Sequence, residues 1–301
     1  MPDGTVPDGT VPGQAHGRSA GASLPVPHTA EGQAGLAALI AQPRRSLIAV
    51  DFDGTLAPIV EDPAAARATP AATAALARLA ELAGTVAIVT GRPAADAASF
   101  ARLAAAGGVI VLGHYGSQRW ERGELSSPEP PPGLSEARAQ LAAVLAAAGA
   151  SEGTFVEDKG EALAVHTRRA EKPQAEFDRL RDPLAGLAAR TGLVLEPGRL
   201  VLELRQPGTD KGAAISGLAA ERASSSILFC GDDLGDRPAF AAVRELRGKG
   251  TPGLLVCSGS AEVPDLAAEA DLVVDGPDGV AALLAGLAEA FAGPADARPS
   301  S

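Results

Sequence analysis

Four short polar segments of this chain place carboxylates, a hydroxyl group and single cations close together. They are Asp51-Phe-Asp-Gly-Thr-Leu, Thr90-Gly-Arg, Asp210-Lys-Gly and Gly231-Asp-Asp-Leu-Gly-Asp. Carboxylate oxygens are ligands that Mg²⁺ prefers, and a hydroxyl group at the start of a helix is suited to an anion. One such segment alone is typical of a solvated turn or a helix cap. All four in one chain, each at the end of an expected strand or the start of a helix, are hard to obtain by chance and indicate one site for a metal ion and an anion.

The elements around these segments alternate between strands and helices. Apolar runs at 46–50, 85–89 and 226–230 predict buried strands, and each ends directly before one of the polar segments. Further strands are expected at 109–112, 253–256 and 272–274, with helices between them. Sites in open parallel sheets form beyond the carboxyl ends of the strands. The sequence therefore predicts an α/β fold, a Rossmann-like parallel-sheet core with these segments at one edge.

A different pattern between residues 121 and 206 predicts an inserted domain. A proline-rich stretch at 126–132 is followed by expected helices at 135–148 and 173–191 and short strands at 154–156, 162–167, 193–196 and 200–204. We expect a smaller α+β cap domain at 121–206 and a core formed by 33–120 and 207–292. Segments 1–32 and 293–301 are rich in Gly, Pro, Ser or Ala, which predicts disordered tails.

Composition narrows the classes of partner. The chain of 301 residues carries a formal charge of −11 without basic clusters, which argues against nucleic acid and anionic membrane surfaces. Cys230 and Cys257 lie in apolar runs, as small core residues do, and do not suggest a disulfide framework. No membrane-length apolar stretch and no signal-peptide pattern is present, so we expect a cytoplasmic protein.

In order and type, the four segments resemble those of the haloacid-dehalogenase-like phosphatase superfamily. The resemblance implies that Asp51 attacks phosphorus and that Asp53 protonates the leaving group and then activates water. It also implies that Thr90 and Lys211 hold the phosphoryl group. Mg²⁺ would be bound by Asp51, by the backbone carbonyl of Asp53 and by Asp232. Asp233 and Asp236 either support this arrangement or merely cap the helix that follows.

Other segments resemble one family within that superfamily, the trehalose-6-phosphate phosphatases. They are Gly113-His-Tyr-Gly, Val156-Glu-Asp-Lys-Gly, Val165-His-Thr-Arg and Leu202-Glu-Leu-Arg, together with the extended first motif Asp51-Phe-Asp-Gly-Thr-Leu-Ala-Pro-Ile-Val. The resemblance implies hydrolysis of trehalose 6-phosphate to trehalose and phosphate, a cap that closes over the sugar, and a functional link to a trehalose-phosphate synthase. The expected substrate-binding residues are Arg92, His114, Glu157, Lys159, His166, Arg168 and Glu203.

Alternation in the predicted strand 162–167 places His166 on the same face as Ala162 and Ala164, opposite Leu163 and Val165. His166 therefore need not lie in the core.

The fourth segment departs from the family pattern, because Gly235 stands where Thr is usual and Arg237 where Glu is usual. This leaves the metal ligand intact but puts the hydrogen bonds behind it in doubt. Two alternatives stay open from the sequence: a phosphatase for another sugar phosphate, such as sucrose phosphate, and an inert module that binds a sugar phosphate.

Overall fold

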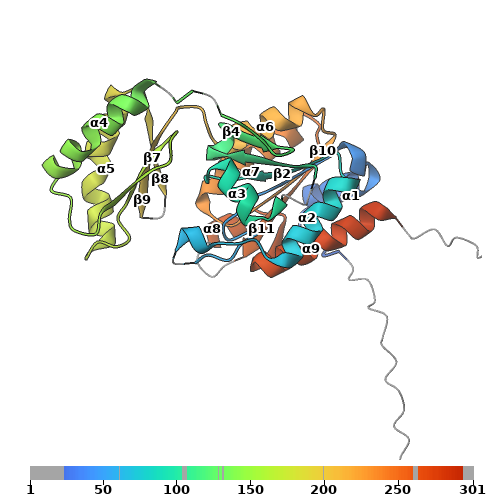
Figure 1. Cartoon of the computed structure of the whole chain (residues 1–301). Coiled ribbons are helices and arrows are strands. Elements are labelled where there is room, and N and C mark those ends of the chain that lie inside the picture. The colour runs from blue at the N-terminus through green and yellow to red at the C-terminus, as the bar shows by residue number, and fades with distance from the viewer. Residues whose placement is uncertain are drawn as a thin grey trace, which may run out of the picture.

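The protein is described by a computed structural model that covers residues 24–60, 62–103, 107–127, 129–130, 132–198, 200–259 and 264–293. Two sheets, each covered by helices, account for most of this part of the chain (Figure 1). The larger sheet forms a core, and the smaller sheet with its two helices stands beside it.

Parallel strands form the centre of the core sheet, in the spatial order β12-β11-β10-β1-β2-β3. Because helices cover both faces of this sheet, its central strands are buried along their whole length, as their continuous apolar sequence predicts. The chain passes from β1 to β2 and β3 on one side and later adds β10, β11 and β12 on the other. The strand order thus reverses between β1 and β10, the point at which open α/β sheets form their sites. The bounds are β1 (Ser46–Val50), β2 (Thr85–Val89), β3 (Val109–Gly113), β10 (Ser226–Gly231), β11 (Gly253–Gly259) and β12 (Leu272–Asp275).

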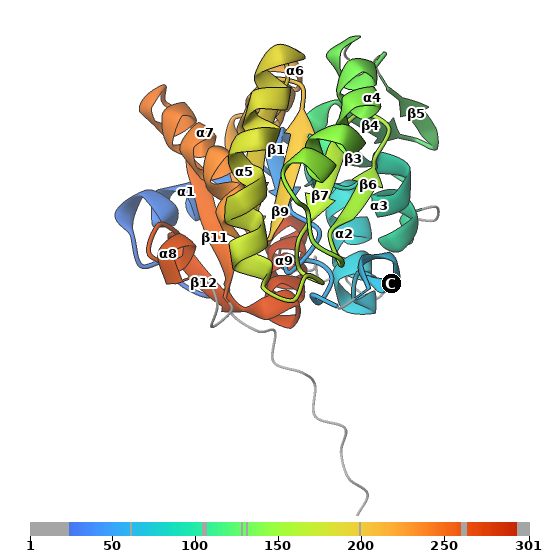
Figure 2. The ribbon, with the colours of Figure 1, turned by 90° about the vertical axis from the view of Figure 1, so that its left-hand side faces the viewer.

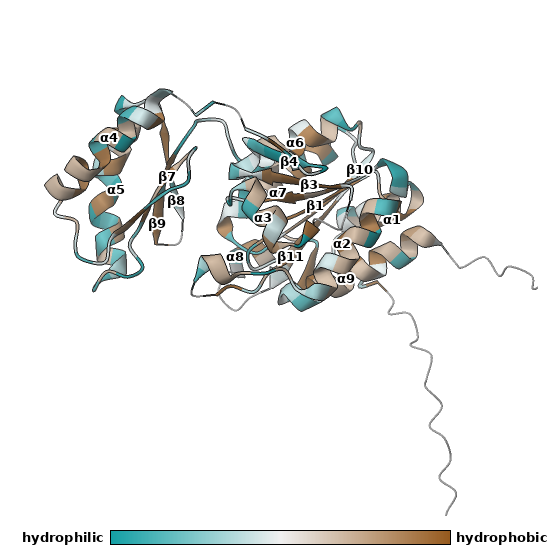
Figure 3. Cartoon of the chain, viewed as in Figure 1, coloured by the Kyte–Doolittle hydropathy of each residue, from teal (hydrophilic) through white to brown (hydrophobic). Residues whose placement is uncertain are grey.

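Helices pack on both faces of the core sheet and create two apolar clusters (Figure 3). Alternate residues of β1 point to opposite faces, so Ile48 and Val50 join one cluster and Leu47 and Ala49 the other. The first face is covered by α1 (Ala30–Ala41), α2 (Pro70–Leu82), α3 (Ala94–Phe100) and α9 (Gly276–Ala292). The second is covered by α6 (Lys211–Glu221), α7 (Arg237–Gly248) and α8 (Pro264–Ala267).

An antiparallel hairpin extends the core sheet beyond β3. Its strands are β4 (Gln118–Glu121) and β5 (Glu124–Ser126), and Trp120 of β4 pairs with Val111 and packs against the first cluster. Residues 121–126 therefore belong to the core sheet, whereas the sequence assigned them to the insert. We place the boundary after Ser126.

The amino-terminal segment joins the fold earlier than its composition suggested. The predicted tail extended to residue 32, but Leu24 packs against the core and α1 begins at Ala30. Thr29 caps α1 by accepting a hydrogen bond from the backbone N–H of Gly32, and it also bonds the Asp271 side chain. Residues 1–23 and 294–301, the rest of the two predicted tails, lie outside the described residues.

The smaller sheet is fully antiparallel, in the order β6-β7-β9-β8. One face packs on α4 and α5, where Leu163, Val165, Leu202 and Leu204 are buried among leucines of both helices. Alternation gives the opposite face to Glu157, Ala164, His166 and Glu203, and this face turns toward the core (Figures 1 and 2). The bounds are β6 (Phe155–Asp158), β7 (Leu163–His166), β8 (Val194–Gly198), β9 (Val201–Arg205), α4 (Pro132–Ala147) and α5 (Pro173–Arg190).

Cys230 and Cys257 are both buried and unpaired. They lie on neighbouring strands but one register position apart, so they point to opposite faces of the sheet and join different clusters. The prediction that both are core residues is confirmed. None of the helices in the described ranges combines the length and apolar character that a membrane span requires.

Candidate active site

Asp51 and Lys211 meet at the point where the strand order reverses. Asp51 directly follows β1, and its backbone N–H donates to the carbonyl of Cys230 on β10 at 2.8 Å. Lys211 is the first residue of α6, and its Nζ lies 2.6 Å from Asp51 Oδ1 and 2.7 Å from Asp236 Oδ1. Burial raises the pKa of Asp51 well above its ordinary value, although Lys211 acts in the opposite direction. Burial also works against the charge of Lys211, but Asp236 and Asp51 raise its pKa well above the ordinary value.

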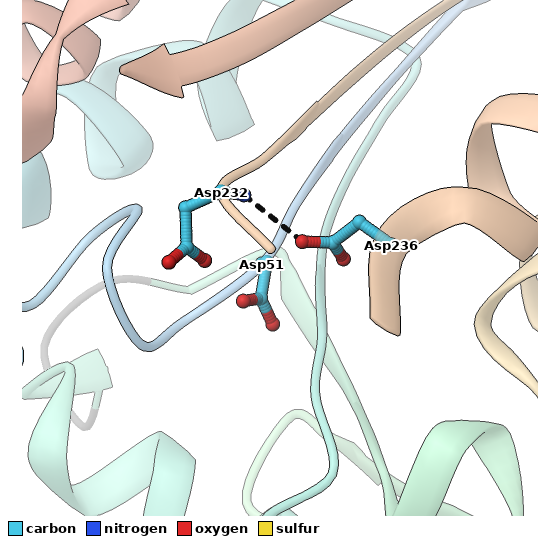
Figure 4. A group of neighbouring side chains, drawn as sticks. All are labelled: Asp51, Asp232 and Asp236. Carbon is cyan, nitrogen blue, oxygen red and sulfur yellow. Dashed lines mark hydrogen bonds between the residues drawn. The ribbon is translucent and has the colours of Figure 1, made fainter. Parts of the chain in front are cut away.

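Asp51 is one of three buried carboxyl groups that lie close together, the others being those of Asp232 and Asp236 (Figure 4). One oxygen of each lies within 4.8 Å of the others. Both oxygens of Asp236 are engaged, because Oδ1 accepts from Lys211 and Oδ2 accepts from the backbone N–H groups of Asp232 and Asp233 at 2.9 and 3.3 Å. Asp51 and Asp232 are therefore the carboxylates best able to bind a cation. Burial raises the pKa of Asp232 to about 8, as expected for a carboxylate whose charge is poorly balanced.

Gly54 lets the first segment approach Asp232 closely. Its φ is +70°, and a Cβ atom at this position would lie 2.0 Å from Asp232 Oδ2. The carbonyl of Gly54 accepts a hydrogen bond from Ser258 Oγ at 2.7 Å. Only glycine satisfies both the backbone angle and the space available, which explains its place in the segment.

Asp53, the expected acid and base, is paired with Arg92. Arg92 Nε and Nη2 donate to the two carboxylate oxygens at 2.7 and 2.6 Å, and Nη1 donates to the carbonyl of Pro63 at 2.8 Å. The guanidinium carbon also lies 5.4 Å from the ring centroids of Phe52 and Phe100. Arg92, which the sequence predicted to bind substrate, thus contacts a predicted catalytic side chain.

The Thr90 segment is held by a tight turn that follows β3. Thr90 is buried, and its Oγ1 accepts from the backbone N–H of Arg92 at 3.2 Å. The turn is the short helix η4 (His114–Gly116), in which the backbone N–H of His114 donates to the Arg92 carbonyl and that of Tyr115 to the Thr90 carbonyl, each at 2.9 Å. Both residues have positive φ, 46° and 59°. This turn fixes the loop that carries the predicted phosphate contact.

Four of the predicted cap residues form two pairs on the face turned toward the core. Lys159 Nζ donates to Glu203 Oε2 at 2.6 Å, and His166 Nε2 lies 2.9 Å from Glu157 Oε2. Burial disfavours the charge of Lys159, but Glu203 more than offsets it and the pKa is raised. The hydrogen bond from His166 lowers the pKa of Glu157. Arg168, by contrast, lies in an exposed turn after β7, and no contact joins it to these pairs in the described residues.

Burial works against the charge of Arg92, but its pKa is raised, chiefly by Asp53. Glu157 adds a smaller contribution in the same direction. The charge of a cap residue therefore acts on the Asp53–Arg92 pair, which agrees with a cap face directed at the site.

Sequence reasoning gave no role to Arg205 and Glu161, which lie at the junction of cap and core. The guanidinium carbon of Arg205 lies 4.6 Å from the ring centroid of Tyr115. Glu161 accepts hydrogen bonds from Gln118 Nε2, at 2.9 Å, and from Ser117 Oγ. A signal for Arg205 was present, because it stands two residues after Glu203 in a strand and so shares its face.

The two unusual residues of the fourth segment do not disturb the hydrogen bonds behind Asp232. The backbone N–H of Gly235 donates to Asp233 Oδ1 at 2.8 Å, which caps the short helix η5 (Leu234–Asp236). Arg237 begins α7 and pairs with Glu269 at 2.9 Å on the surface. Asp236 Oδ2 accepts from the backbone N–H groups of Asp232 and Asp233, so neither unusual residue is needed for these bonds.

Known proteins are similar to this chain over most of its residues. Residues 49–275 match the family model described as Trehalose-phosphatase. The trehalose-phosphate phosphatase of Mycolicibacterium paratuberculosis is 35% identical over 229 residues, which are 70% of this chain and 55% of that protein. The trehalose-phosphate phosphatase of Mycobacterium marinum is 36% identical over 216 residues, 66% of this chain and 52% of that protein. The chain thus spans about half the length of these relatives.

A solved structure shows the same fold. The C-terminal domain of the trehalose-6-phosphate phosphatase of C. albicans superposes with a TM-score of 0.71 at 22% identity, over 89% of this chain and 99% of that one.

Proposed function

Because the chain belongs to the trehalose-phosphatase family, we propose that it hydrolyses trehalose 6-phosphate to trehalose and inorganic phosphate. The observation that carries the proposal is the buried contact between Asp51 and Lys211 at the switch point of the sheet, below the polar face of the cap. A carboxylate in contact with a buried ammonium group is suited to attack a phosphate ester, because the cation offsets the repulsion between two anions.

The reaction proceeds in two displacements. An oxygen of Asp51 attacks phosphorus, the bond from phosphorus to the sugar oxygen breaks, and Asp53 gives that oxygen a proton. Water then attacks the aspartyl phosphate, Asp53 takes a proton from the water, and phosphate leaves as Asp51 is restored. Lys211 and the hydroxyl group of Thr90 hold the phosphoryl oxygens during both displacements.

The carboxylates fit a magnesium ion. Asp51 and Asp232 offer hard oxygen atoms that nearby cations satisfy only in part, and Mg²⁺ is commonly bound by one or two carboxylates together with substrate oxygens and water. We assign Asp51, the backbone carbonyl of Asp53 and Asp232 as its ligands in the protein. When bound, the ion would neutralise charge on the transferring phosphoryl group.

The sugar binds against the polar face of the cap. Glu157, Lys159 and Glu203 supply donors and acceptors there, as neutral hydroxyl groups require, and His166 and His114 complete the proposed set. Arg168 has no contact with this set in the described structure, so its role in binding requires movement of its turn.

The enzyme that forms a phosphorylated disaccharide, a trehalose-phosphate synthase, is the proposed source of the substrate. The unpaired state of Cys230 and Cys257 is compatible with the cytoplasmic location that we propose.

Phosphate release from trehalose 6-phosphate, sucrose 6-phosphate and glucose 6-phosphate tests this function. We expect the highest kcat/KM for trehalose 6-phosphate. A clear preference for sucrose 6-phosphate or glucose 6-phosphate would show a phosphatase of another specificity. Binding without phosphate release from any of the three would refute the enzymatic proposal.

A further inference from the structure

A cluster of unpartnered polar atoms lies between the cap and the core. In the described part of the chain, seven buried side-chain nitrogen or oxygen atoms lack a hydrogen-bonding partner. Five of them belong to His114, Glu203 and Arg205, and these three residues line one cleft. An unpartnered buried polar group destabilises the fold, because it has lost its hydrogen bonds to water. Five such atoms in one place indicate that a bound group completes them.

The cleft is small and is built from both domains. The η4 turn lines it from the core with His114 and Tyr115, and β9 lines it from the cap with Glu203 and Arg205. Its free volume of about 10 Å³ is close to what one water molecule or one hydroxyl group needs. It is too small for a whole sugar ring.

Arg205 is held in a fixed orientation within this cleft. Its Nη2 donates to Glu196 Oε2 at 2.8 Å, and its guanidinium carbon lies 4.6 Å from the Tyr115 ring centroid. Tyr115 in turn packs on Gly91, where an added Cβ atom would lie 2.8 Å from the ring. These contacts leave Nε and Nη1 of Arg205 as unused donors.

Glu203 supplies the matching acceptor. Its Oε2 accepts from Lys159, whereas its Oε1 has no partner among the described residues. A hydroxyl group accepts from N–H donors and donates its own proton to an oxygen, so it pairs with both Arg205 and Glu203. Binding of an anionic group in this cleft is disfavoured, because the carboxylates of Glu203 and Glu161 already line it.

We propose that Arg205 is an additional specificity-determining residue, which completes, with the expected sugar-binding residues His114 and Glu203, a subsite for a hydroxyl group of the substrate's sugar. This proposal rests on the proposed function, since it assumes a sugar phosphate as substrate. Because the subsite takes one side from each domain, it is complete only while cap and core keep their relative positions. A sugar hydroxyl group bound there would hold the two domains together.

The test compares Arg205→Met with Arg205→Lys and with Arg181→Met, a control on an exposed residue of α5. For each protein, kcat/KM is measured with trehalose 6-phosphate and with p-nitrophenyl phosphate, which has no sugar. We expect Arg205→Met to lower the ratio of kcat/KM for trehalose 6-phosphate to kcat/KM for p-nitrophenyl phosphate about tenfold or more. This is the effect expected from the loss of one or two charged hydrogen bonds. Arg205→Lys should recover part of the ratio, and Arg181→Met should leave it unchanged.

A second measurement is independent of turnover. In the Asp51→Asn background, calorimetry with trehalose 6-phosphate should show weaker binding when Arg205→Met is added. An unchanged ratio together with unchanged binding would overturn the subsite. Equal losses with both substrates, accompanied by a lower unfolding temperature, would overturn it as well, since they indicate a structural role only.

The wild-type protein separates this proposal from the proposed function. If it prefers another sugar phosphate, the assignment to trehalose 6-phosphate fails. The subsite is then tested by the same comparison of wild type with Arg205→Met, with the preferred sugar phosphate in place of trehalose 6-phosphate. If it shows no preference for any sugar phosphate over p-nitrophenyl phosphate, both proposals fail.

Discussion

Arg92 holds both carboxylate oxygens of Asp53, at 2.7 and 2.6 Å. A guanidinium group that donates to both oxygens fixes the direction of a carboxylate. Arg92 is itself held by the Pro63 carbonyl and two aromatic rings, so it acts as a rigid support. This arrangement orients Asp53 for the two proton transfers of the proposed reaction, to the sugar oxygen and then from water.

We therefore expect Arg92→Gln to lower kcat by roughly tenfold to a hundredfold with both trehalose 6-phosphate and p-nitrophenyl phosphate, because Asp53 loses its orientation. The control is Arg78→Gln, which removes an exposed arginine of α2 that pairs with Glu81. Steady-state kinetics with both substrates provides the measurement. A rise in KM for the sugar phosphate with kcat intact would instead support the substrate-binding role that the sequence suggested for Arg92.

Asp51→Asn should abolish turnover, with a loss on the order of a thousandfold or more, because an amide does not attack phosphorus. Folding should survive, which circular dichroism and the unfolding temperature can check. With Mg²⁺ and beryllium fluoride, the wild-type protein should form a phosphoryl mimic on Asp51, and the variant should not. Asp265→Asn, at an exposed position, is the matched control. Substantial activity of folded Asp51→Asn would falsify the mechanism.

Removal of divalent metal by EDTA should stop phosphate release, and added Mg²⁺ should restore it. Ca²⁺ should restore little, because its larger coordination number favours engagement of both Asp51 oxygens and so blocks attack. Calorimetric titration should also show that Asp232→Asn weakens Mg²⁺ binding. Full activity in the presence of the chelator would contradict the assigned ligands.

Replacement of the polar cap residues should damage use of the sugar more than the phosphate chemistry. We expect Glu157→Ala, Lys159→Ala and Glu203→Ala each to lower kcat/KM for trehalose 6-phosphate by about tenfold or more relative to p-nitrophenyl phosphate. Losses can appear in kcat as well as KM, because binding of the sugar can help to close the cap. Glu152→Ala, in an exposed cap turn, is the control. Equal effects on both substrates at all three positions would show that sugar specificity lies elsewhere.

Gly54→Ala should impair activity without any change in a charged residue. The added methyl group would meet Asp232 and would also strain a backbone with φ of +70°. We expect weaker Mg²⁺ binding and a lower kcat, measured by titration of activity against Mg²⁺ concentration. Gly248→Ala provides a comparison, because a Cβ atom at this position would have open space around it. Wild-type metal dependence in Gly54→Ala would show that the loop has room to yield.

The parts of the fold with a strong local pattern were predictable from the sequence. The apolar run of β1 and the alternation in β7 depend only on neighbouring residues, and the structure has Leu163 and Val165 buried opposite His166 as expected. The hairpin β4–β5 was not recognised, because its residues are half-buried or exposed and carry no apolar alternation. Its pairing with β3 is a tertiary contact that a local pattern does not report.

In the candidate site, too, some residues could be predicted from sequence motifs, whereas contacts between distant segments could not. Motif order indicated Asp51 and Lys211, whose contact the sheet topology explains. The partnership of Arg92 with Asp53 joins residues 39 positions apart, and that of Arg205 with Tyr115 joins the two domains. Neither partnership has a periodic signal in the sequence. The hydrogen bond from Thr29 to Asp271 fixes part of the predicted tail. It joins residues 242 positions apart and likewise has no local signal in the sequence.

The buried positions of the two cysteines make the protein well suited to site-directed labelling. Burial raises the pKa of both thiols, that of Cys257 to about 11 and that of Cys230 well above its ordinary range, so both should react slowly with maleimides. These are the only two cysteines of the chain. A fluorophore pair on cysteines introduced at Arg181 in the cap and Arg78 in the core would therefore report the distance between the domains without prior removal of native thiols. Movement of the cap during a single turnover then becomes directly observable.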